Sequence, residues 1–108
     1  MKDFVGRGSG DAADFSDLYD RIGTVLTDEN RPMKERFRAL FTLRNLPGKK
    51  SVDVIAKGFK DPSALLKHEC AYCLGQMRDP YAVDVLITVL EDLSQEPIVR
   101  HEAGILHC

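Results

Sequence analysis

The segment Val52-Asp53-Val54-Ile55 returns 31 residues later as Val83-Asp84-Val85-Leu86, and this repetition decides the fold. Two further segments repeat in the same order: Phe59-Lys60-Asp61 returns as Leu90-Glu91-Asp92, and Lys67-His68-Glu69 returns as Arg100-His101-Glu102, the latter after 33 residues. Self-similarity at a period of about 30 residues is typical of repeat architectures. A unit of this length cannot bury its apolar face alone, so neighbouring units must stack.

Each unit is expected to contain two helices. The first pair is predicted over residues 32–45 and 50–60, and the second over residues 62–77 and 81–93. A proline stands at the start of each unit, where the first turn of a helix tolerates it. The β-branched run Val83–Leu90 would suit a strand, but its counterpart Val54–Phe59 would make a poor one. The repeat therefore predicts an all-α fold, an α-solenoid of helical hairpins.

The chain divides into a short arm and one repeat domain. Residues 1–13 are rich in Gly and Asp, so they are predicted to form a flexible, disordered arm. The domain is predicted over residues 14–108. It comprises a first helix at 14–28, repeats at 32–60 and 62–93, and a partial repeat at 97–108. The partial repeat predicts a truncated solenoid without the polar cap that closes such a stack.

Composition excludes several classes of function. The 108 residues carry 15 Lys and Arg against 17 Asp and Glu, so the near-neutral charge gives no support for nucleic-acid binding. The most apolar stretch, Val85–Leu90, is far too short to span a membrane, and no secretory signal precedes it. Three cysteines are an odd number without a disulfide pattern, which favours a reducing intracellular compartment.

The helix predicted over residues 62–77 separates apolar and polar side chains. At 100° per residue, one apolar stripe forms from Leu66, Cys70, Cys73, Leu74 and Met77. His68 falls on the opposite side and Glu69 on the flank. His101 and Glu102 take the same places on the next first helix. Because stacked helices lie about 8–10 Å apart, the two His-Glu pairs can converge.

Imidazole and carboxylate together are ligands for iron, manganese, zinc or nickel. The pairs are not the HExxH motif of zinc proteases, since Tyr72 and Ile105 stand where a second histidine would be. They are also not the Glu-x-x-His motif of ferritin-like bundles. The alternative is that they are ordinary polar residues on helix surfaces.

Four segments resemble the deoxyhypusine hydroxylase family of HEAT-repeat di-iron monooxygenases: residues 36–44, 63–69, 71–77 and 95–104. The resemblance covers residues 18–104. It implies O2-dependent hydroxylation of a deoxyhypusine side chain on a eukaryotic translation initiation factor, which forms hypusine. It also implies iron held by four His-Glu pairs, of which His68, Glu69, His101 and Glu102 would be the amino-terminal half. The cytoplasm is the expected location, with the nucleus as a second.

The sequence departs from the family pattern after Gly104. It ends at Ile105-Leu106-His107-Cys108, so the third and fourth His-Glu pairs are absent. We therefore expect a truncated form with little activity alone. A dimer, or a separate chain carrying the other half, would be needed to complete the ligand set.

Other features keep two interpretations open. Cys70 and Cys73 could form a redox pair or bind zinc, but their place on the apolar stripe favours a structural role. Leu65 and Tyr72, on the His68 side, either line a substrate cleft or pack between helices. The alternative function for the whole chain is a non-catalytic HEAT-repeat module that binds a protein partner.

Overall fold

The computed structural model describes the backbone of residues 8–107 and the side chains of residues 16–105. Within that part every regular element is helical. The order is α2 (Gly8–Thr27), α3 (Met33–Arg44), α4 (Lys49–Ala56), the 3-10 helix η1 (Lys57–Lys60), α5 (Ala64–Met77), α6 (Pro80–Glu91) and α7 (Pro97–His107). The predicted all-α solenoid and the helical state of Val83–Leu90 are confirmed.

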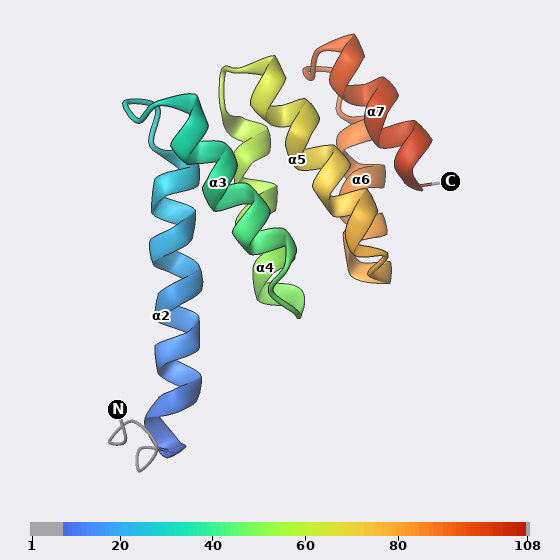
Figure 1. Ribbon diagram of the computed structural model, residues 1–108. Helices are drawn as coiled ribbons and strands as arrows, with labels where there is room; N and C mark the ends of the chain where they lie inside the picture. The colour runs from blue at the N-terminus through green and yellow to red at the C-terminus, as the bar shows by residue number, and fades with distance from the viewer. Residues whose placement is uncertain (1–7, 108) are drawn as a thin grey trace.

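The helices form two layers (Figure 1). The first helices of the units, α3, α5 and α7, lie side by side, and α4 and α6 lie behind them. Helix α2 packs against both α3 and α4, as the second helix of a preceding unit would. The molecule is accordingly elongated, with extents of 49 × 32 × 17 Å. None of the described helices is long and apolar enough to cross a membrane.

The start of α2 differs from the sequence-based boundary. The helix begins at Gly8 rather than Asp14, so residues 8–13, which were expected to belong to a disordered arm, have helical backbone. Extending an existing helix by a few residues needs no new nucleation, and Ala12 and Ala13 have high helix propensity. The rest of the predicted arm, residues 1–7, lies outside the described residues.

Local signals set the ends of the helices in the second unit. The Ser63 side chain accepts a hydrogen bond from the backbone N–H of Leu66 and caps α5. Asp79 caps α6 in the same way, with Pro80 in its first turn. Between them Arg78 adopts a left-handed conformation with φ of 53°, which ends α5 and turns the chain back. These caps fix where each helix starts along the stack.

One continuous core runs between the two layers. Its largest fully buried aliphatic side chains come from every helix with described side chains: Leu26, Leu40, Leu43, Val52, Val54, Ile55, Leu66, Leu74, Leu86 and Val99. The stripe predicted on α5 is confirmed, because Leu66, Cys70, Cys73 and Leu74 are buried and Met77 packs against the core. Each unit thus buries its apolar face against its neighbours, as a solenoid requires.

Candidate metal-binding site

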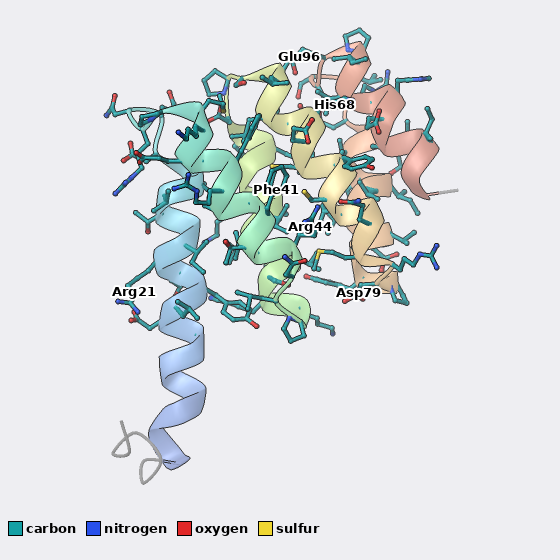
Figure 2. All side chains as sticks on the ribbon, in the orientation of Figure 1. Arg21, Phe41, Arg44, His68, Asp79 and Glu96 are labelled. Carbon is teal, nitrogen blue, oxygen red and sulfur yellow. The ribbon has the colours of Figure 1, made fainter. Side chains whose placement is uncertain are left out.

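Helix α5 carries the first His-Glu pair on the side that its core stripe leaves free. With Leu66 and Cys70 fully buried, His68 and Glu69 project away from the core. Their side chains are 30% and 28% exposed, so neither is fully solvated. His68 lies on the part of α5 that is turned toward α7 (Figure 2).

Helix α7 carries the second pair in the equivalent place. Val99 and Ala103 are fully buried and anchor α7 on α5 and α6. Glu102 points back toward α5, and its side chain is 17% exposed. His101 is exposed. The second pair is therefore split, with the carboxylate inside the interface and the imidazole outside it.

The structure brings three of the four predicted residues together around His68. Its Nε2 lies 3.0 Å from Glu102 Oε1 across the α5–α7 interface, and its Nδ1 lies 3.7 Å from Glu69 Oε2 on its own helix. Both ring nitrogens therefore face a carboxylate. Among the side chains described, His101 makes no hydrogen bond or ion pair with the other three.

These residues fit iron in type but form an incomplete set. Imidazole nitrogen and carboxylate oxygen are donors that iron accepts. Among the described residues, however, no three His, Cys, Asp or Glu side chains are grouped so that they could hold a metal ion. In addition, Nε2 of His68 cannot both bond Glu102 and bind a metal, so that contact must open before His68 can serve as a ligand. The four-residue metal set stays a prediction.

The two residues expected at a substrate cleft are both on the surface. Leu65 is 56% exposed and Tyr72 42% exposed, so neither is buried between helices. They belong to the same helix as His68, and the other first helices also carry exposed apolar side chains, namely Phe41, Ile98 and Ile105. Their assignment to a substrate cleft stays a prediction.

The two internal cysteines are part of the core. Cys70 and Cys73 are free and fully buried. Burial raises the pKa of both thiols, that of Cys73 to about 11, so both are neutral near pH 7. A neutral, buried thiol is a poor nucleophile and metal ligand. The structural interpretation of this pair is confirmed.

A hollow on α3 was not anticipated from the sequence. It has a volume of about 550 Å³, and its lining residues are Lys34, Phe37, Arg38, Phe41, Thr42 and Asn45. At the edge of this hollow, the Arg44 guanidinium lies 5.1 Å from the centre of the Phe41 ring and makes a cation–π contact with it. The sequence did contain a signal for this hollow, because Phe37 and Phe41 lie one helical turn apart and therefore share a face of α3.

Two ion pairs were also missed: one is buried, and in the other a buried lysine meets a glutamate that is 41% exposed. Arg36 binds Asp61 with both side chains below 5% exposed, and Lys67 Nζ lies 2.6 Å from Glu96 Oε1. Two signals could have revealed them. Arg36 and Lys67 are 31 residues apart, and both acids stand directly before a proline.

Comparison with known proteins shows which protein family the chain belongs to. The family model of HEAT repeats matches residues 20–106. Deoxyhypusine hydroxylases of Drosophila pseudoobscura pseudoobscura and Rattus norvegicus are 64% and 63% identical over 83 residues, which is 77% of this chain and 28% of each relative. The chain thus spans just over a quarter of the length of these curated relatives.

A solved structure of a deoxyhypusine hydroxylase is also similar to this chain. Human deoxyhypusine hydroxylase, determined in complex with glycerol, superposes with a TM-score of 0.82 at 50% identity. The match covers 91% of this chain and 34% of the human one. The resemblance to deoxyhypusine hydroxylase is thereby confirmed, and the chain belongs to the family of HEAT-repeat proteins.

Proposed function

We propose that this chain supplies one half of the iron-ligand set of a deoxyhypusine hydroxylase. The reaction is the O2-dependent hydroxylation of a deoxyhypusine side chain on a eukaryotic translation initiation factor, in the cytoplasm with the nucleus as a second location. The identity of 57–64% to enzymes of that name supports this proposal. The observation that carries it is the His68–Glu102 contact at 3.0 Å, because it joins a donor of each His-Glu pair across two helices.

In this proposal His68, Glu69, His101 and Glu102 hold iron, which when bound supplies the activation of O2. The metal-binding form of histidine is the neutral imidazole. Because Nε2 of His68 contacts Glu102, this ring must turn before the nitrogen can face the ion. His101 is exposed, so its side chain must turn inward from the surface. Glu69 and Glu102, both partly buried, place negative charge where the cation would sit. Leu65 and Tyr72 would contact the protein substrate.

The chain alone is expected to bind iron weakly and to turn over little or no substrate. Two imidazoles and two carboxylates cannot complete the coordination of two iron ions. The remaining donors would have to come from outside these 108 residues, for example from a second copy or from a complementing half of the enzyme. A symmetric dimer could present four pairs across its twofold axis.

The test is reconstitution with Fe(II) without oxygen, followed by iron analysis, native mass measurement and an assay of deoxyhypusine hydroxylation. Retained iron should fall in His68→Ala and His101→Ala. His107→Ala is the matched control, since it removes the chain's third imidazole, which lies outside the proposed set. Iron content unchanged by the first two substitutions, or efficient turnover by a monomer, would contradict the half-site proposal.

A second candidate is a non-catalytic protein-binding module. The α3 hollow favours it, since exposed Lys34 and Arg38 flank two aromatic rings there, as at protein interfaces. Iron analysis separates the two. A module should purify free of iron, and its His68→Ala variant should behave like the parent in every metal measurement.

A further inference from the structure

Helix α3 is strongly basic, although the whole chain has a net charge of −2. Its cations are Lys34, Arg36, Arg38 and Arg44, and its one acid is Glu35. The fold itself uses two of these cations, because Arg36 binds a buried aspartate and Arg44 Nη1 donates to Gln76 Oε1 at 2.9 Å. Lys34 and Arg38 are exposed and form no ion pair with any described residue. The positive charge that α3 leaves free is therefore concentrated at these two side chains.

The two free cations border the hollow on α3, which also contains two aromatic rings. The centres of the Phe37 and Phe41 rings lie 6.2 Å apart, and the rings are tilted by 36°. Arg44, which Gln76 of α5 holds in place, lies against the Phe41 ring and supports it (Figure 2). Phe41 nevertheless stays 36% exposed. An exposed aromatic side chain that is already held in place loses little conformational freedom on binding, which suits an interface anchor.

Stacking of the repeats does not require these residues at this place. In the 31-residue repeat, Phe37 and Arg38 are equivalent to His68 and Glu69 on α5. The same positions therefore accept an aromatic residue and a cation in one unit and a His-Glu pair in the next. Packing within the fold thus leaves unexplained why α3 presents two rings and two free cations on one exposed face. A ligand that offers both apolar surface and negative charge would match this face.

We propose that the α3 hollow docks an acidic segment of a partner protein. An aromatic or leucine side chain of that segment packs against Phe37 and Phe41, and its carboxylates bind Lys34 and Arg38. These two cations are four residues apart, about 6 Å along the helix axis. Alternate side chains of an extended peptide are separated by about 6–7 Å, so carboxylates at alternate positions can reach both cations.

The shape of the hollow favours a peptide as its occupant. All its lining residues belong to α3, so it is a feature of one helix face, whereas small molecules bind in clefts that enclose most of their surface. The net negative charge of the chain disfavours a polyanion such as nucleic acid. The inference rests on the protein-binding candidate given above and names its partner, and it is independent of iron binding.

The probe is a displayed library of random dodecapeptides, selected for binding to the intact chain. Enriched sequences should carry Asp or Glu at alternate positions beside an aromatic residue or leucine. A selected peptide is then labelled with fluorescein, and its anisotropy gives the Kd for the chain and its variants. Arg38→Glu and Phe41→Ala should each raise the Kd at least about tenfold, because they remove a charge partner and an aromatic anchor.

Two matched controls separate this effect from general changes of charge or hydrophobicity. Arg21→Glu makes the same charge change at an exposed position of α2, away from the Phe41 ring (Figure 2). Leu93→Ala removes an apolar side chain that is 81% exposed. Both should leave the Kd within about twofold of the parent value. Circular dichroism checks that every variant keeps its helical fold.

Charge reversal tests the proposed contacts directly. The chain with both Lys34→Glu and Arg38→Glu should lose the acidic peptide and bind the same peptide with Lys in place of each acid. The proposal is overturned if the library yields no peptide, if the enriched peptides are not acidic, or if the swapped pair does not bind while the variant stays folded. It is also overturned if phosphatidylserine vesicles or poly(U) RNA bind through these side chains more tightly than any selected peptide. The iron measurements with His68→Ala test the half-site proposal separately.

Discussion

At the scale of single residues, the buried pair of Arg36 and Asp61 is costly to break. The side chains are 4% and 3% exposed, and Arg36 also donates to the Leu26 carbonyl. Removing one partner leaves a buried charge without compensation, which costs about 3–5 kcal/mol. The pair also links the first unit to the loop that begins the second, so its loss would loosen the joint between them.

We therefore expect Asp61→Ala to lower the free energy of unfolding by about 3–5 kcal/mol, measured by urea denaturation. The matched control is Asp17→Ala, which removes the partner of Arg21 from a pair that is 67–72% exposed. An exposed pair of this kind contributes about 1 kcal/mol or less. Equal losses in the two variants would show that burial of the Arg36–Asp61 pair adds nothing.

Helical periodicity was the only basis in the sequence for predicting the candidate site, so it could indicate helix faces but not contacts between helices. Spacing of 100° per residue placed His68 and Glu69 away from the buried stripe on α5, and the repeat placed Glu102 on the next helix. Periodicity says nothing about how far α5 is shifted along α7. It also does not say which face of α7 is turned toward α5: in the structure Glu102 lies on that face and His101 is exposed. The burial of Arg36 and Lys67 was missed because pattern reasoning assigns charged residues to the surface.

At the scale of elements, the close approach of η1 to α5 depends on a glycine. A Cβ added to Gly58 would lie 2.6 Å from Cys70 Sγ, well inside contact distance. Gly58 is buried in η1, so the missing side chain lets this turn lie directly on α5. The repeat predicted the second-layer helix over residues 50–60 but not its change from α-helix to 3-10 helix at Lys57. That change depends on tertiary packing rather than on local propensity.

Gly58→Ala should lower the free energy of unfolding by about 1–3 kcal/mol, because the added methyl group overpacks the η1–α5 contact. In a chain that also carries Cys70→Ala, the smaller side chain leaves room for the methyl group. The double variant should therefore lose less stability than the two single losses together. Urea denaturation of the three variants measures this difference. Lys57→Ala, an exposed change in the same turn, is the control and should have little effect. Strictly additive losses would place the added methyl group somewhere other than against Cys70.

At the scale of the whole molecule, stability should be distributed unevenly along the stack. Helix α5 has more neighbours than the end helices: α3, α4, η1, α6 and α7 all pack against it. Among the described helices, α7 packs chiefly against α5 and α6, and α2 lies at the opposite end. In a solenoid each unit is stabilised mainly by adjacent units, so the end elements open at lower free energy than the middle. The helix pairing that produces this gradient could be predicted from the 31-residue repeat alone.

Native-state hydrogen exchange should therefore be slowest in α5 and at least about tenfold faster in α7, a difference set by the free energies of local opening. A chain in which residues 1–104 are followed by a second copy of residues 72–105 offers an internal control. The added residues should pack against α7, so they should slow exchange in α7 while leaving α2, at the far end, unchanged. Protection in α7 that equals that of α5 in the parent chain would indicate one cooperative unit instead of a stack. Slower exchange in α2 and α7 alike would mean that the extension stabilises the chain globally rather than through its contact with α7.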